Sequence, residues 1–117
     1  MNLELAAKRL AELGHSTRLG IFRHLVRCGP NGCPVGDVQQ ILDIPASTLS
    51  HHIGRLVSVG LVEQRRDGRV LYCLPMFEAF DETIEFLAAE CCQGSYEIDE
   101  TCAPSSKTQQ RGRGRAR

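Results

Sequence analysis

Apolar residues recur every three to four positions along much of the chain, a spacing that predicts helices with one buried face. Gly14, the Gly-Pro-Asn-Gly segment at residues 29–32 and Pro45 interrupt this pattern and separate its stretches. Pro45 suits the first turn of a helix, where its missing N–H costs no hydrogen bond. The pattern therefore predicts four consecutive helices, at about residues 2–13, 16–27, 34–42 and 45–58.

The pattern changes after Gly60, where two short runs at residues 61–66 and 70–74 predict β-strands. Asp67-Gly68 lies between them, and this dipeptide favours a tight hairpin turn. A last helix is expected at residues 76–92, because its apolar positions alternate spacings of three and four. We expect the chain from residue 103 onward to be disordered, since it contains no aliphatic residue larger than Ala.

The third and fourth predicted helices are joined by a very short turn, and the fourth carries a polar face opposite its apolar stripe. Two helices at this spacing are typical of a helix-turn-helix, and the hairpin that follows would be its wing. We therefore predict a mainly α fold with a β-hairpin wing, a winged helix-turn-helix of the α+β class. Residues 1–94 would form the DNA-binding and dimerisation domain, and residues 95–117 a C-terminal tail.

In this arrangement the fourth helix would enter the major groove of double-stranded DNA, and the hairpin arginines would lie along phosphates. Hydroxyl and imidazole groups can hydrogen-bond to base edges or phosphates, whereas an arginine can reach a guanine or a backbone oxygen. The alternative is an ordinary solvated helix beside a charged turn, but the two features together favour DNA. His52 is expected to pack partly under the helix. The predicted DNA-binding residues are Ser47, Thr48, Ser50, His51, Arg55, Arg65, Arg66 and Arg69.

Composition adds a marked charge asymmetry to a chain whose formal net charge is zero. Residues 1–74 carry nine Lys or Arg against six Asp or Glu, whereas residues 75–102 carry eight acidic residues and no basic ones. Nucleic acid, which is negatively charged, would bind the basic N-terminal part, residues 1–74. With 5% aromatic residues in 117, the core is thin, which favours completion by dimerisation. We find no membrane-length apolar run and no signal-peptide pattern, so a cytoplasmic protein is expected.

Four segments of the sequence form a distinctive set: residues 15–21 (His-Ser-Thr-Arg-Leu-Gly-Ile), 47–52 (Ser-Thr-Leu-Ser-His-His), 60–62 (Gly-Leu-Val) and 66–72 (Arg-Asp-Gly-Arg-Val-Leu-Tyr). Together they closely resemble the ArsR (ArsR/SmtB) family of metal-responsive repressors, over about residues 5–92. This resemblance implies a homodimer held by the first and last helices. It also implies binding to an inverted-repeat operator in the absence of inducer.

Many members of that family carry a Cys-Val-Cys metal box in the helix before the recognition helix. The corresponding positions here are Pro34-Val35-Gly36, so this site is absent and Cys33 alone does not replace it. The chain is instead similar to a branch of the family whose arsenic ligands lie at the end of the last helix and just beyond it. The metal ligands implied by this resemblance are Cys91, Cys92 and Cys102.

Three thiolates suit trivalent arsenic or antimony, because soft sulfur ligands select soft ions. The inducer is therefore expected to be arsenite, antimonite or a methylated arsenical, with no organic cofactor. Closing the short segment between Cys92 and Cys102 costs little entropy, so one chain could supply all three thiols, although a site shared across the dimer stays open. The remaining three of the six cysteines are assigned to structure, Cys28 and Cys33 as loop residues and Cys73 on a strand.

Other functions remain possible for the same residues. The C-terminal cysteines could form a thiol-redox switch, or bind divalent cadmium, lead or zinc. The fold could also serve as a protein-interaction module with a vestigial helix-turn-helix. An enzyme is not expected, because we find no phosphate-cradling Gly loop, Ser-His-acid set or pair of poised carboxylates. The operator sequence and the role of the Arg-rich end are left open.

Overall fold

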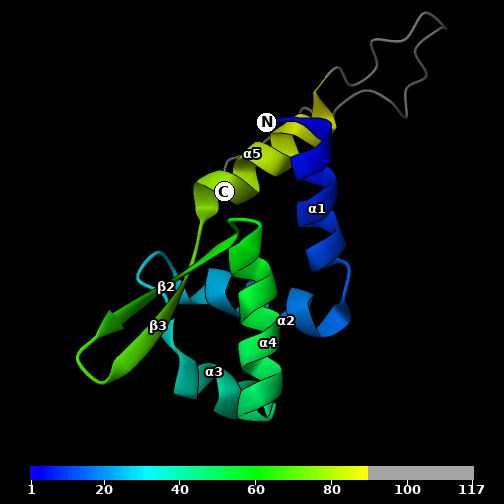
Figure 1. Ribbon diagram of the computed structural model, residues 1–117. Coiled ribbons are helices and arrows are strands. Elements are labelled where there is room, and N and C mark those ends of the chain that lie inside the picture. Colours follow the sequence, from blue (N-terminus) through cyan, green and yellow to red (C-terminus); the bar gives the residue numbers. More distant parts are fainter. Residues whose placement is uncertain (90–117) are drawn as a thin grey trace, which may run out of the picture. The chain divides into compact units, whose positions relative to one another are not determined.

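A computed structural model describes residues 1–89 of the chain (Figure 1), and these residues form the predicted winged helix-turn-helix with one additional strand. They belong to a compact unit at Met1–Leu87 and to the beginning of a second unit, Ala88–Arg117. The predicted boundary at residue 94 lies outside the described residues and stays a prediction. The elements are α1 (Leu3–Leu13), α2 (Ser16–Cys28), β1 (Cys33–Pro34), α3 (Val35–Leu42), α4 (Ala46–Ser58), β2 (Val62–Asp67), β3 (Val70–Pro75) and α5 (Phe77–Ala88).

The hydrophobic core forms where α2 and α4 pack against each other. Ile21 and Leu25 of α2 are fully buried, as are Leu49, Ile53 and Leu56 of α4. Burying each such side chain contributes roughly 1.5–3 kcal/mol relative to leaving it exposed. Val38 of α3 and Leu61, at the entry to β2, belong to the same cluster. Residues that are distant in sequence thus share one small aliphatic core.

The turn between α3 and α4 is only a few residues long. Asp43 ends α3 with a φ of 53°, a left-handed conformation that Asp tolerates better than most residues. Pro45 immediately precedes α4 as its N-cap rather than lying within the first turn as expected. The chain therefore reverses sharply and starts α4 at Ala46, which gives the helix-turn-helix.

A three-stranded antiparallel sheet forms the wing and its base, in the order β1–β3–β2. The β2–β3 pairing runs from Val62 opposite Pro75 to Asp67 opposite Val70, and Gly68 adopts a φ of 65° in the turn. The predicted hairpin is confirmed, but its turn is Gly68-Arg69 rather than Asp67-Gly68, because Asp67 is the last residue of β2. The sequence did not predict β1, a two-residue strand whose Cys33 lies opposite Cys73 of β3.

Arg9 joins α1 to α5 through a set of buried hydrogen bonds. Its Nε donates to the Val59 carbonyl at 2.8 Å, and its guanidinium also donates to the Ala79 carbonyl at 3.2 Å and to Thr83 Oγ1 at 3.1 Å. A further ion pair joins Arg9 to Glu82 at 3.0 Å.

The apolar residues of α5 are divided between core and surface: Phe80 packs inward against the core, whereas Ile84 and Leu87 stay exposed. Among the described helices, none is long and apolar enough to cross a membrane.

Candidate nucleic-acid interface

The N-terminal half of α4 presents a continuous polar face. Ser47, Thr48, Ser50 and His51 are all exposed, and spacings of three to four residues place them on neighbouring turns of one helix side. Leu49 points the opposite way and is buried. The core packing of α4 therefore brings together four of the predicted DNA-binding residues, whose contacts with DNA stay a prediction.

The three predicted arginines of the wing are all exposed, and they lie near the end of the β2–β3 hairpin. Figure 1 shows this hairpin extending away from the helices. Arg65 and Arg66 are neighbours on β2, opposite Tyr72 and Leu71 of β3. Because successive strand residues point to opposite faces of a sheet, their two side chains leave different faces of the hairpin. Arg69 is in the turn. A DNA backbone lying along one face of the wing would thus contact Arg69 and one of Arg65 and Arg66 most directly.

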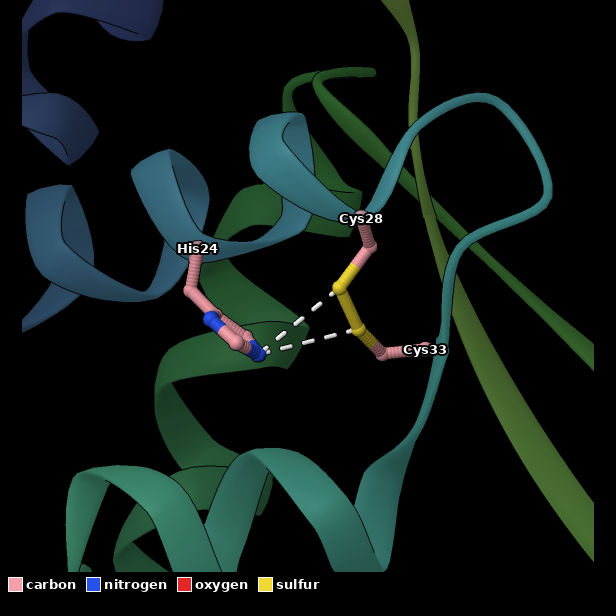
Figure 2. Close-up of a disulfide and its surroundings, with 3 residues drawn as sticks. All are labelled: His24, Cys28 and Cys33. Atoms are coloured by element: carbon pink, nitrogen blue, oxygen red, sulfur yellow. Dashed lines mark hydrogen bonds between the residues drawn. A yellow bond between two sulfur atoms is a disulfide. The ribbon is translucent and has the colours of Figure 1, made fainter.

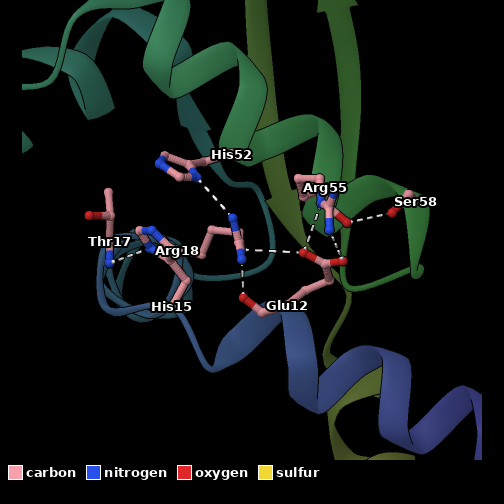
Figure 3. Close-up of polar contacts among 7 residues, drawn as sticks. All are labelled: Glu12, His15, Thr17, Arg18, His52, Arg55 and Ser58. Atoms are coloured by element: carbon pink, nitrogen blue, oxygen red, sulfur yellow. Dashed lines mark hydrogen bonds and ion pairs between the residues drawn. The ribbon is translucent and has the colours of Figure 1, made fainter.

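Arg55 lies in the last turn of α4 and is engaged within the protein (Figure 3). Its Nε donates to Glu12 Oε1 and its Nη2 to Oε2, both at 3.0 Å, which gives a bidentate pair with a carboxylate of α1. The Arg55 side chain is still 52% exposed. Two of its five donors are used, so a contact with a DNA phosphate stays a prediction that depends on the remaining donors.

Glu12 is the centre of this polar cluster, with a side chain only 11% exposed. Besides Arg55, it pairs with Arg18 of α2, whose Nε lies 3.3 Å from Oε1 and donates to the Glu12 backbone carbonyl at 2.7 Å. The hydrogen bonds from Arg55, aided by the charges of Arg55, Arg18 and His51, hold the pKa of Glu12 below its ordinary value despite its burial. Three helices therefore converge on one ionised carboxylate.

His52 extends the cluster on the buried side of α4, as the sequence predicted (Figure 3). It is 8% exposed, and Arg18 Nη1 donates to its Nδ1 at 3.2 Å. Burial lowers the pKa of His52, and the nearby charges of His15, Arg18 and His51 lower it further. The neutral ring is favoured, which leaves Nδ1 free to accept from the guanidinium.

Comparison with known proteins agrees with this geometry. The helix-turn-helix domain family matches residues 13–65. The "Putative arsenical resistance operon repressor ArsR" of Halobacterium salinarum is 36% identical over 67 residues, which are 57% of this chain and 51% of that protein. The HTH-type transcriptional regulator YgaV of Escherichia coli is 35% identical over 72 residues, 61% of this chain and 71% of YgaV. The crystal structure of an ArsR-family transcriptional regulator superposes with a TM-score of 0.65 at 26% identity, covering 77% of this chain and 89% of that one.

The chain belongs to the ArsR family. It spans about half the length of the Halobacterium relative that it matches. The relatives are named as transcriptional regulators, which supports the prediction that this ArsR-family protein is not an enzyme.

The cysteines of this ArsR-family chain fall into two groups. Cys91, Cys92 and Cys102, the predicted arsenic ligands, lie outside the described residues, so their role stays a prediction. The other group is described in full, and the expectation that Cys28 and Cys33 are loop residues is wrong. Cys28 is the last residue of α2, Cys33 lies in β1, and a disulfide joins them. Two features of the sequence pointed to this arrangement. The two cysteines flank a Gly-rich turn, and a residue that precedes proline, as Cys33 does, favours the β conformation.

Cys73 lies on β3 as predicted, and it is the one free cysteine within residues 1–89. Burial raises the pKa of its thiol, and a hydrogen bond with Gln64 offsets this only in part. A buried thiol of this kind is chemically inert compared with an exposed thiolate. The prediction that Cys73 has a structural role fits this environment.

The polar cluster also contains residues that the sequence did not single out. Glu12 was not predicted as functional, because its partner Arg55 is 43 residues away. Arg18 lies in a segment that resembles the family, but it was not predicted as a partner of Glu12. The only indication was that two charged residues flank the break between the first two helices.

Glu12→Gln removes the charge of this carboxylate while keeping its size. We expect the variant to lose about 1–2 kcal/mol of unfolding free energy at neutral pH, because hydrogen bonds between charged groups contribute on this order. The pKa of Glu12 is lower in the folded than in the unfolded chain. Its stabilisation is therefore complete above the ordinary value of 4.5 and is lost as the pH falls through the lower folded-state pKa. Urea unfolding at a series of pH values measures this.

Glu85→Gln, at an exposed carboxyl of α5, is the matched control and should differ little from wild type at any pH. A stability difference between wild type and Glu12→Gln that stays constant down to about pH 3 would contradict the role given to the Glu12 charge.

Proposed function

We propose that this ArsR-family protein is a homodimeric transcriptional repressor that binds an inverted-repeat operator and releases it when trivalent arsenic or antimony binds. The observation that carries the DNA-binding part is the exposed, donor-rich face of α4 beside an arginine-bearing wing. The names of the two curated relatives, a repressor and a transcriptional regulator, support the same conclusion.

The start of α4 is suited to contact with DNA. Its first turn holds no acidic residue, and Pro45 offers no side chain to satisfy the free backbone N–H groups. Helix N-termini with free amides favour phosphate oxygens, both by hydrogen bonding and by the helix dipole. In helix-turn-helix proteins the N-terminal residues of the second helix contact base edges. Thr48 and His51 occupy that position here, and the wing arginines would add phosphate contacts.

The dimer follows from apolar surface that one chain leaves uncovered. Leu3 of α1 is 74% exposed, and Ile84 and Leu87 of α5 are 45% and 53% exposed. The Arg9 hydrogen bonds connect these two helices. Exposed apolar patches of this kind mark interaction surfaces. A symmetric pairing through α1 and α5 would present two copies of α4, which suits half-sites about one DNA turn, or roughly 34 Å, apart.

The inducer part rests on Cys91, Cys92 and Cys102, and it is supported by the sequence and by one relative. Three thiolates match the preference of trivalent arsenic, and the Halobacterium relative is named as an arsenical resistance operon repressor. Cys91 follows the end of α5 by three residues. Ligand capture there would rearrange a segment directly attached to the proposed dimer helix. A coupling of about 1–3 kcal/mol between two such sites is typical, and two sites in a dimer would be enough to empty an operator.

Thr48→Ala and His51→Ala should each weaken specific operator binding by about 1–3 kcal/mol, or roughly 5- to 150-fold. Arg69→Ala should weaken binding to all sequences and should reduce the slope of log K against log salt by about one. Fluorescence anisotropy with operator and scrambled duplexes at several salt concentrations measures both effects. Arg23→Ala, at an exposed arginine of α2, is the charge-matched control. Unchanged operator affinity in both α4 variants would rule out α4 as the recognition helix.

The combined variant Leu3→Glu and Ile84→Glu should sediment as a monomer, because it places charges in the proposed apolar interface. Operator affinity should fall with it, since one copy of α4 reaches only one half-site. Ile41→Glu is the matched control, because Ile41 is an equally apolar α3 residue with 63% exposure. Retention of the dimer by the α1/α5 variant, or its loss in Ile41→Glu, would place the interface elsewhere.

Arsenite or antimonite should release the fully reduced protein from its operator, whereas peroxide in the absence of metalloid should not. Changing Cys91, Cys92 and Cys102 together to Ser should abolish release without changing operator affinity. Cys28→Ser is the matched control and should still respond. If the triple variant still releases DNA on arsenite addition, the ligand assignment is wrong. If the reduced wild type holds its operator in saturating arsenite and antimonite, the inducer proposal fails.

A further inference from the structure

Three metal-ligating side chains converge at the end of α2 (Figure 2). His24 Nε2 lies 3.7 Å from the Sγ atom of Cys28 and 3.7 Å from that of Cys33. The three ligand atoms all lie within 4.8 Å of one another. In the part of the chain that the structure describes, this is the one such group of three or more His, Cys, Asp or Glu side chains.

The fold places these ligands on rigid elements. His24 and Cys28 are four residues apart on α2 and therefore share one face of the helix. Gly32 turns the chain back with a φ of 75°, and a side chain there would collide with the Cys73 carbonyl. The β1–β3 pairing then fixes Cys33 opposite Cys73. Cys33 is thus held near α2 by its strand pairing with β3 as well as by the disulfide with Cys28.

We propose that, when the Cys28–Cys33 disulfide is reduced, His24, Cys28 and Cys33 form a three-ligand site for a zinc-like divalent ion. A cellular dithiol would supply the two electrons and two protons that convert the disulfide to two thiols. The ion would then displace both thiol protons and bind two thiolates and the Nε2 lone pair. The ion and the disulfide exclude each other, because both use the same sulfur electrons.

The two N···S distances fit such an ion, whereas the two sulfurs must separate after reduction before both can bind it. Zinc binds imidazole nitrogen at about 2.0–2.1 Å and thiolate sulfur at about 2.3 Å, which requires N···S separations of roughly 3.5–3.8 Å for tetrahedral to trigonal angles. Both N···S distances here are 3.7 Å. The Cα atoms of the two cysteines are 6.1 Å apart, which leaves room for the reduced sulfurs to separate by side-chain rotation. Closure of the site therefore needs little movement of His24.

The ligand types select the class of ion. Two thiolates with one imidazole suit zinc and its relatives, whereas hard ions such as magnesium or calcium prefer oxygen. The set lacks the third thiolate that the proposed arsenic site provides, since Cys73 is outside the cluster. Three protein ligands leave the fourth position of a tetrahedral ion open. Because His24 and Cys28 are partly exposed, water can reach that position.

The test uses the full chain with Cys91, Cys92 and Cys102 changed to Ser, so that the proposed arsenic ligands cannot contribute. The protein is reduced with a phosphine, which competes weakly for metal, and is titrated first with cobalt(II) and then with zinc(II). We expect one cobalt per chain, a near-ultraviolet thiolate-to-cobalt charge-transfer band, four-coordinate visible bands, and loss of both on zinc addition. The air-oxidised protein should show none of these.

His24→Ala should reduce zinc affinity at least about tenfold, the lower end of the losses seen even for groups that only support a metal ligand. Cys28→Ser should lower the charge-transfer intensity and the affinity further. His51→Ala, at an exposed histidine of α4, is the control and should bind like the parent. Circular dichroism of each variant shows that it is folded. The inference fails if the reduced parent gives no thiolate-to-cobalt band, if His24→Ala binds zinc as tightly as the parent, or if oxidation leaves binding unchanged. None of these outcomes depends on DNA or arsenite, so failure of the zinc site would leave the proposed function untouched, and failure of the proposed function would leave the zinc site untouched.

Discussion

The packing of α4 on α2 determines what this protein can present to a ligand. Leu49, Ile53 and Leu56 have almost no exposed surface and lie in the same cluster as Ile21 and Leu25. Because a helix has only one rotation that buries this stripe, Thr48, His51 and their neighbours must face solvent. The polar face therefore results from the same constraint that stabilises the core, at roughly 1.5–3 kcal/mol for each buried aliphatic side chain.

The Glu12 cluster adds a constraint that apolar packing does not provide. Aliphatic contacts are non-directional, so they fix the rotation of α4 better than its position along its own axis. The two-pronged pair between Glu12 and Arg55 is directional, and Arg18 ties the same carboxylate to α2. This use of Arg55 competes with the predicted contact between its guanidinium and DNA. Arg55, which the sequence predicted to contact DNA, is therefore also a residue that positions α4.

The sequence predicted those parts of the structure that depend on local patterns. The helices follow from apolar spacing, and the hairpin follows from Asp67-Gly68 between two strand-like runs. The polar face of α4 was also visible, because its position opposite an apolar stripe is a property of the helix alone.

The features that the sequence missed depend on pairings between distant residues. β1 is two residues long and exists only through its pairing with β3, some 40 residues later. The Glu12–Arg55 pair spans 43 residues, and no periodicity within one helix reveals it. The spacing of His24 and Cys28 was visible, but Cys33 joins them only because of the left-handed turn at Gly32 and the register with Cys73.

The two sulfur sites proposed here would act on different parts of the fold. The ligands beyond α5 adjoin the helix that carries exposed Ile84 and Leu87, so they would act on the dimer. The His24 cluster instead connects α2 to β1, and β1 pairs with β3 at the base of the wing. A change of state at this cluster would therefore reach the arginine-bearing hairpin through the sheet. Since wing arginines would bind phosphates without reading sequence, such a change would alter overall DNA affinity more than operator choice.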